Sequence, residues 1–442
     1  MRFPTRAGIS TLLTGLALLA AAPAGAQFAQ YTAPGSLLTR GTTKKEQLEK
    51  AAENARWHLG PFRLAPWAAL RDAAYVSDVF AGTLEGEVPG TKAEPDFTIT
   101  AGAGLQGYLP LGPKAFFTVE ALPQYVYWQK HDERRRLNGY YGAGLFGFFN
   151  RLSLQAVARR AEEQTVLTPE FEQRIHSRQD VLDGSLELRL GHAFYLFGSA
   201  SWLTFEPLIG DLGDDPRLPL FQDLNRDERV LRGGVELRPD DRVRVAVGVE
   251  RSEVEFDGAA RDRSNTGTSP ILEASFQTER LSLSGALARR SLKPDPGSEL
   301  VPFDDTTGHI LATFIPRWRL SYSVYAGRDL TYSIDPGYSH FVADRLGGSI
   351  GAKLGRSSSM DVFYETGGHD YARTSAAVPA RQDDFNAYGT TLHLQLGERV
   401  RWNLGVQRTQ LEAPDRPGLD RSLTVFQSNL EFSAFGGAFT LR

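Results

Sequence analysis

The sequence predicts an all-β fold, a transmembrane antiparallel up-and-down β-barrel of about 18 strands preceded by a short periplasmic N-terminal helix. Two observations support this prediction. Apolar and polar residues alternate with a period of two along most of the chain, and short connections alternate with long ones. The first pattern is typical of strands. The second is typical of a membrane barrel, which has short turns at one rim and longer loops at the other. A soluble β-sandwich explains the first pattern but not the sorted connections.

The clearest strand pair lies between Val230 and Phe256. Its two runs flank the polar turn Pro239–Asp241. In each run one face is apolar and the other carries charge. The apolar positions are Leu231, Gly233, Val235 and Leu237 in the first run, and Val243, Val245, Val247 and Val249 in the second. Both faces of this hairpin are therefore defined by the sequence alone.

The N-terminus has the features of a secretory signal peptide. The start MRFPTR is basic, an apolar run follows over 9–22, and Pro23–Ala26 ends in small residues. We expect cleavage before Gln27, a periplasmic leader over 27–56 and an outer-membrane barrel over 57–442. A membrane anchor is the alternative for the apolar run, although the run is short for a membrane span. The chain has no cysteine, which excludes a disulfide framework.

A short helix is predicted over Thr42–Arg56. Strong helix formers follow a threonine that can cap the helix, and the only large apolar residue is Leu48. Such a helix cannot form a core alone. We expect it to dock on the barrel mouth or on another periplasmic protein.

The strands are expected over 58–79, 96–110, 114–128, 136–149, 151–162, 180–190, 193–204, 229–238, 242–256, 269–278, 280–290, 307–316, 318–333, 340–354, 357–367, 383–396, 399–411 and 421–441. The last of these changes parity, which a bulge near Ala434 would explain. The connections expected to be long include 163–179 and 205–228. The second of these, rich in aspartate, is the best candidate for a loop inserted into the barrel.

One face of the strands is predicted to contact lipid, and the other to line the lumen. Lipid-facing sets include Leu186, Leu188 and Leu190; Leu281, Leu283 and Leu287; Leu392, Leu394 and Leu396; and Val400, Trp402, Leu404 and Val406. A barrel with a polar interior also explains a mean hydropathy of −0.30 in a membrane protein. Aromatic residues near strand ends suggest an interfacial girdle. They are Phe116, Phe117, Tyr125, Tyr127, Trp128, Phe148, Phe149, Trp202 and Trp318.

Charged residues of both signs are assigned to the lumen. The basic ones are Arg159, Arg189, Arg232, Arg242, Arg244, Arg345, Lys353 and Arg401, and the acidic ones are Glu120, Asp183, Glu187, Glu236, Glu250, Glu273, Asp361 and Glu365. Single-sign rings would predict ion selectivity. This balanced set suits a polyhydroxylated solute better. The same charges can equally pair with one another and stiffen the barrel, and the two interpretations are compatible.

The sequence contains no motif for catalysis, cofactor binding or a metal site. The acidic run Asp223–Glu228 resembles the start of a calcium loop, but the glycine expected at the sixth position is missing, which favours an acidic external loop. The eight histidines form no recognisable partner constellation. We therefore expect no enzyme activity, no cofactor and no metal. The formal net charge of −4 gives no indication of nucleic-acid binding.

The start of the barrel resembles a family of outer-membrane β-barrel porins. The segment Trp57–Pro66 (WHLGPFRLAP), then Ala74–Phe80 (AYVSDVF) and Asp96–Thr98, resembles the family's "GPFRL-P" strand, its "GYDSNVF"-like rim and its aspartate-led second strand. Ala74 replaces a glycine of the family pattern, and Ser77-Asp78 stands where the family has Asp-Ser-Asn. The resemblance covers about the first 50 residues of the barrel. It gives no ligand residues, and Gly60, Pro61 and Phe62 are expected to serve barrel closure.

This resemblance implies an exopolysaccharide-pathway barrel in the outer membrane of a Gram-negative-type bacterium. The main hypothesis is therefore export of a secreted polysaccharide, with a periplasmic polysaccharide export protein as partner at Thr42–Arg56. Outer-membrane lipid and lipopolysaccharide would surround the barrel. The alternatives are a general diffusion porin for small hydrophilic solutes, which an inserted loop with segregated acidic and basic clusters would favour, and a closed assembly or adhesion barrel.

Overall fold

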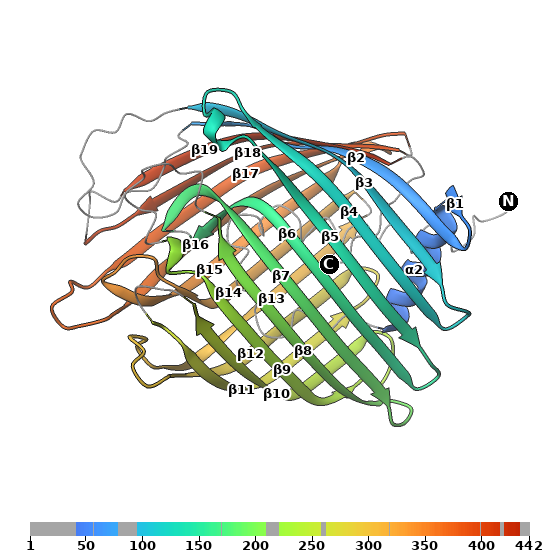
Figure 1. Cartoon of the computed structure of the whole chain (residues 1–442), viewed down its shortest axis with the longest axis horizontal. Coiled ribbons are helices and arrows are strands. Elements are labelled where there is room, and N and C mark those ends of the chain that lie inside the picture. Colours follow the sequence, from blue (N-terminus) through green and yellow to red (C-terminus); the bar gives the residue numbers. More distant parts are fainter. Residues whose placement is uncertain are drawn as a thin grey trace.

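The computed structural model describes residues 41–55, 57–77, 95–168, 170–208, 221–257, 262–317, 319–397, 399–415 and 420–433. Its strands form a single 19-stranded antiparallel sheet. Strands β2 to β19 follow one another in sequence order, and β19 pairs with β2, so that 18 strands close into a barrel (Figure 1). The predicted fold class and strand number are confirmed.

The strands are β1 (Trp57–Leu59), β2 (Phe62–Val76), β3 (Asp96–Pro110), β4 (Ala115–Trp128), β5 (Arg136–Phe148), β6 (Leu152–Thr168), β7 (Phe171–Arg189), β8 (Phe194–Pro207), β9 (Arg226–Leu237), β10 (Val243–Phe256), β11 (Asn265–Gln277), β12 (Leu281–Pro294), β13 (Phe303–Arg317), β14 (Leu320–Tyr332), β15 (Tyr338–Lys353), β16 (Ser358–Arg373), β17 (Gln382–Leu396), β18 (Val400–Glu412) and β19 (Arg421–Ser433). Helix α2 spans Gly41–Asn54, and a short 3-10 helix, η1, spans Asp132–Arg134.

Several predicted strand boundaries are wrong, and the differences at the first strand and in the β6–β7 hairpin change the architecture. The expected first strand breaks at Gly60, whose φ of 61° turns the chain, so β1 folds back on β2 and closure is made by β2. The expected loop 163–179 instead continues β6 and β7 as a long hairpin. This extension is not an alternating apolar segment, and its sequence therefore lacks the signal of a lipid-facing strand. The predicted signal peptide and the proposed bulge near Ala434 lie outside the described residues.

Short connections gather at one end of the barrel, where α2 and β1 also lie, and the longer ones gather at the other end (Figure 1). We call these the short-turn end and the loop end. At the turn between β9 and β10, the Asp240 carboxylate accepts hydrogen bonds from the backbone N–H groups of Arg242 and Val243 at 2.8 and 2.9 Å. This side-chain capping explains why Pro-Asp-Asp forms a tight turn.

The outer face of the barrel is apolar. Val247, Leu186 and Ile350 expose 59, 47 and 51% of their surface, which in a membrane contacts lipid rather than water. Two residues expected in the aromatic girdle are buried instead. Phe116 packs against α2, and Trp128 lies under the Arg134 guanidinium. Since neighbouring residues of a strand point to opposite faces, Phe116–Phe117 and Tyr127–Trp128 cannot both contact lipid.

Candidate functional site: the lumen and its two ends

Many of the charged residues predicted to line the lumen pair across neighbouring strands. Arg232 on β9 donates from Nε to Glu250 on β10 at 2.6 Å, and both side chains are almost fully buried. Arg159 on β6 pairs with Asp183 on β7 at 2.7 Å. Each charge loses water when it is buried, and its partner compensates for that loss. The prediction that lumen charges pair with one another is therefore right for these residues.

A longer chain of ion pairs follows the short-turn half of the wall from β7 to β11. Glu187 contacts Arg238, Arg238 contacts Glu236, and Arg244 lies 2.9 Å from Glu236 and 3.4 Å from Glu273. Arg238 follows the last residue of β9 and was not predicted. Its spacing of two from Glu236 places both on the same face, which is the signal that could have identified it.

Five more of the predicted residues also have partners on the wall, and most of these partners were not predicted. Glu120 accepts a hydrogen bond from Gln106 at 2.9 Å, and Glu365 accepts one from the Tyr325 hydroxyl. The remaining contacts are Arg345–Asp329 at 2.5 Å, Asp361–His393 at 2.9 Å and Arg401–Glu431 at 3.8 Å. The partners are therefore two neutral residues, two further acids and one histidine, which the balance of the predicted charges does not reveal.

Three predicted lumen residues lie at the short-turn end. Arg242 belongs to the exposed turn before β10, and Arg189 ends β7 and donates to the carbonyl oxygens of Gly191 and His192 at 3.0 and 3.3 Å. Arg189 also lies 5.9 Å from the centre of the Tyr195 ring, which Arg238 covers as well, so that it stands at the rim of the wall, while Arg242 directly precedes β10; their place in the lumen stays a prediction. Lys353 ends β15 at this same end of the barrel.

Helix α2 lies against the inner wall at the short-turn end. Leu48, with no exposed surface, packs with Ala51 and Ala52 against an apolar patch of the wall that comprises Tyr108, Phe116, Phe146 and Val157. Lys44 donates to Gln155 at 3.2 Å and lies 5.1 Å from the centre of the Phe146 ring. The expectation that the helix docks on the barrel mouth is confirmed. Its apolar face is thereby covered by the barrel itself.

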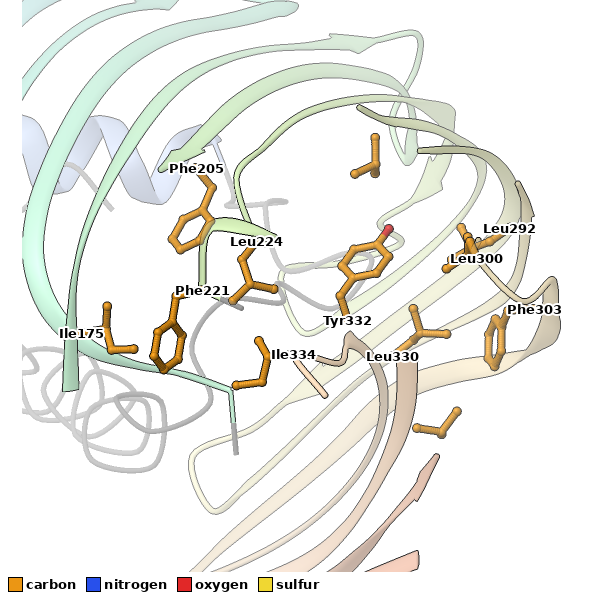
Figure 2. Close-up of a cluster of buried hydrophobic side chains, with 12 residues drawn as sticks. Ile175, Phe205, Phe221, Leu224, Leu292, Leu300, Phe303, Leu330, Tyr332 and Ile334 are labelled. Carbon is orange, nitrogen blue, oxygen red and sulfur yellow. The ribbon is translucent and has the colours of Figure 1, made fainter. Parts of the chain in front are cut away.

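At the loop end, an apolar cluster extends from one side of the barrel towards the other. Phe221 and Leu224, from the connection between β8 and β9, lie between Ile175 on β7 and Ile334 in the connection between β14 and β15 (Figure 2). We call these four residues, with the wall residues they contact, the external plug. The wall residues are Phe205, Val254, Leu292, Phe303, Leu330, Tyr332 and Val342, and Leu300 joins the cluster from the connection between β12 and β13.

The prediction of a loop inserted between 205 and 228 agrees with this plug, within the residues described. Asp223, expected in a solvated acidic loop, is instead buried, and its carbonyl oxygen accepts a hydrogen bond from Arg263 at 2.5 Å. Arg263 also donates to the carbonyl oxygen of Ser333. One guanidinium thus joins the β8–β9 connection to the β14–β15 connection.

A second arginine joins three connections at the loop end. Arg381, before β17, lies 2.6 Å from Asp383 and 3.1 Å from Asp335, and it is 4.0 Å from Glu170 at the tip of the β6–β7 hairpin. Glu170 in turn accepts hydrogen bonds from the Ser333 hydroxyl at 2.6 Å and the Ile334 N–H at 2.8 Å. We call this polar set the latch. It could not be predicted, because Glu170, Asp335 and Arg381 lie in three connections far apart in sequence.

Burial raises the pKa of Glu170 above its ordinary value, although Arg381 and the two hydrogen bonds act in the opposite direction. The acids of the latch outnumber its single guanidinium, so that the cluster carries excess negative charge when Glu170 is ionised.

Within the described residues, no group of histidine, aspartate and glutamate side chains could hold a metal ion. None of the helices described is long and apolar enough to span a membrane.

The barrel is similar to solved outer-membrane porins. OccK2 (OpdF) from Pseudomonas aeruginosa is 11% identical with a TM-score of 0.52, and the match covers 84% of this chain and 98% of that one. A BenF-like porin from Pseudomonas fluorescens is 13% identical with a TM-score of 0.50, and OpdK from P. aeruginosa is 10% identical with a TM-score of 0.50; each match covers 84% of this chain and 98% of the other. No protein-family model matches the sequence, and no curated protein matches it.

The closed barrel, the apolar outer face and these similarities define the class of the protein. It has the fold of an outer-membrane porin. Identities this low establish the fold and not the solute. The expected membership of an exopolysaccharide-export subtype gains no support from the comparisons.

Proposed function

We propose that this chain is a diffusion channel for small hydrophilic solutes in the outer membrane of a Gram-negative-type bacterium. The observation that carries the proposal is the external plug. Phe221 and Leu224 lie inside the barrel and meet Ile334 from a connection on another side. An inserted loop narrows a wide barrel to the size of a small solute. A conduit for a polymer would need a continuous wide lumen instead.

The polar wall supports the same function. Buried ion pairs such as Arg232–Glu250 hold charge at the wall in a balanced form, which gives a wettable lumen without a strong preference for one sign of ion. The charges at the plug are interleaved, since Arg263 and Arg381 lie among acidic and carbonyl oxygens, so the segregated clusters named above as favouring a diffusion porin are not present among the described residues. We therefore expect weak charge selectivity, in contrast to a channel with opposed acidic and basic arcs.

The porins of similar fold favour a diffusion channel over export of a polysaccharide, which was the leading hypothesis from the sequence. A closed assembly or adhesion barrel is the second candidate. It is favoured by one observation, that α2 and the external plug occupy opposite ends of the barrel.

A liposome-swelling assay tests the proposal. The mature chain is refolded into liposomes, and the initial swelling rate is measured in a series of uncharged solutes of increasing mass. A diffusion channel passes the small members and excludes the large ones at a definite size. Passage of long polysaccharide at rates similar to those of small solutes would restore the export hypothesis. Absence of swelling in every solute would favour the closed barrel.

A further inference from the structure

The middle of the inner wall over β17, β18 and β19 carries uncharged amide and hydroxyl groups, in contrast to the ion pairs that line much of the lumen. We call this region the amide strip. Its side chains lie on the lumen-facing parity of three consecutive strands. They are Thr391, Asn403, Gln407, Gln427 and Asn429.

The register brings these groups together. Asn403 lies directly opposite Asn429, and Gly405 lies between Thr391 and Gln427. A Cβ atom added at Gly405 would lie 3.2 Å from the Gln427 Nε2 and 3.4 Å from the Thr391 Oγ1. Both side chains therefore converge over Gly405. With strands about 4.8 Å apart, the strip offers several donors and acceptors within about 10 Å.

An aromatic ring borders the strip. Phe363 on β16 lies opposite Gly389 on β17, and a Cβ at Gly389 would be 2.7 Å from the ring atom Cε1. The ring therefore covers the glycine, and it remains partly exposed. A few convergent hydrogen-bonding groups beside an apolar or aromatic surface are the usual composition of a site for an organic solute.

The charged groups at the edge of the strip are matched by opposite partners. His393 contacts Asp361 at 2.9 Å and Asn403 at 2.8 Å, and Glu431 lies 3.4 Å from Arg71 and 3.8 Å from Arg401. The five side chains of the strip are themselves uncharged, and the described charged groups at its edge contact partners on the wall.

The amide strip is also left uncovered by the two packed clusters. Among the described residues, neither the external plug nor the cluster around α2 includes a member from β17, β18 or β19. Asn403, Gln407, Gln427 and Asn429 all keep part of their surface exposed. A solute that crosses the barrel can therefore reach them.

From these observations we propose that the amide strip is a binding site for neutral polyhydroxylated solutes, that is, sugars and short oligosaccharides. The inference rests on the proposed channel function and specifies its solute class. Amide and hydroxyl groups each donate and accept hydrogen bonds, as sugar hydroxyls do, and the Phe363 ring offers an apolar surface to the C–H face of a sugar. Such bonds are individually weak, so that a bound sugar is held briefly and then passes on.

The test is single-channel recording of the refolded mature chain in a planar bilayer with maltohexaose, a neutral probe. Binding in the lumen interrupts the ion current, and the interruptions give an apparent affinity and a residence time. A hexamer of galacturonic acid, similar in size but anionic, is the comparison solute. The informative variant is Asn403→Leu with Gln427→Met, which keeps side-chain volume and removes two hydrogen-bonding groups. The control is Gln277→Met, an exposed amide at the short-turn end of β11.

We expect maltohexaose to interrupt the current more strongly than the anionic hexamer does. The double variant should keep the ion conductance and bind maltohexaose roughly tenfold more weakly, the effect of two lost hydrogen bonds of ordinary strength. Gln277→Met should behave as the wild type. If the double variant does not assemble, Phe363→Leu supplies the same readout from a different strand.

The outcomes separate the two proposals. The sugar site is overturned if the channel conducts ions steadily and maltohexaose does not interrupt the current. It is also overturned if the interruptions are unaffected by the double variant and by Phe363→Leu. Both outcomes leave the diffusion channel intact. Absence of any ion conductance overturns the channel and the sugar site together.

Discussion

Glu170, at the tip of the β6–β7 hairpin, accepts a hydrogen bond at 2.8 Å from the backbone N–H of Ile334, in the connection between β14 and β15. Strands β7 and β14 are far apart in the ring of strands, so this contact crosses the loop end of the barrel. Ile334 also belongs to the external plug. The same residue thus links the polar latch to the apolar packing that narrows the lumen.

Removal of the Arg381 guanidinium should open the loop end. Arg381→Ala leaves Glu170, Asp335 and Asp383 buried without their shared counter-charge, and loss of one partner from a buried ion pair costs about 3–5 kcal/mol. We expect a higher single-channel conductance and faster cleavage of the loop-end connections by proteinase K. The strands themselves should stay folded.

The matched control is Arg289→Ala. Arg289 also pairs with an aspartate, Asp304 at 3.1 Å, but both side chains are mostly exposed, at 69 and 58%. Its conductance and protease sensitivity should equal those of the wild type. Equal behaviour of the two variants would show that Arg381 does not hold the loop end.

The latch should respond to pH through Glu170. Because burial raises the pKa of this carboxyl, the folded latch favours its protonated form. The stabilisation from this group is therefore complete below the ordinary pKa of 4.5 and is lost as pH rises through the raised value. Channel conductance should be lowest in acid and should increase several-fold with pH. Glu170→Gln, which stays uncharged, should flatten this dependence, and an unchanged pH profile in that variant would exclude the mechanism.

Helix α2 should restrict the short-turn end of the lumen. Leu48→Ala removes a completely buried side chain, and such a change costs about 2–5 kcal/mol, which is comparable to the whole docking energy of a short helix. Conductance should rise, and protease should release the helix while the barrel resists digestion. Glu53→Ala, on the exposed face of the same helix, is the control. Unaltered conductance and cleavage in Leu48→Ala would mean that the helix does not limit the lumen.

The Arg232–Glu250 pair should contribute to barrel stability. Glu250→Gln removes the charge partner of a guanidinium that is almost fully buried. We expect a loss of about 3–5 kcal/mol in the free energy of unfolding. Urea titration in detergent micelles, followed by tryptophan fluorescence, measures this loss. A midpoint unchanged from the wild type would indicate that water reaches Arg232 and compensates for the missing charge.

Much of the barrel could be predicted because a lipid-facing strand has a strict physical requirement. Every second residue must be apolar over the membrane, so residues such as Val245, Val247 and Val249 define strand, face and register together. Outside the lipid-facing segments this requirement does not apply, and there the strand prediction fails. The hairpin that continues β6 and β7 and the turn at Gly60 lie outside alternating apolar segments, and their conformations depend on pairing and backbone geometry.

The lumen was predicted only in part. Parity identified residues such as Arg159 and Asp183, which do pair. It could not identify the latch or the contacts of the external plug, although 205–228 was predicted as an inserted loop, since Glu170, Arg381 and Phe221 lie in connections whose paths no local pattern specifies. Long-range contacts between loops are decided by the closed barrel, which brings distant connections to one rim.

The most direct test of the proposed function is the ion current through a planar bilayer that contains the refolded mature chain, with Arg381→Ala recorded in parallel. The proposal predicts discrete, steady channels for the wild type, a modest conductance set by the plug, and a larger conductance for Arg381→Ala. Absence of channels in both proteins would contradict the proposal and identify a closed barrel.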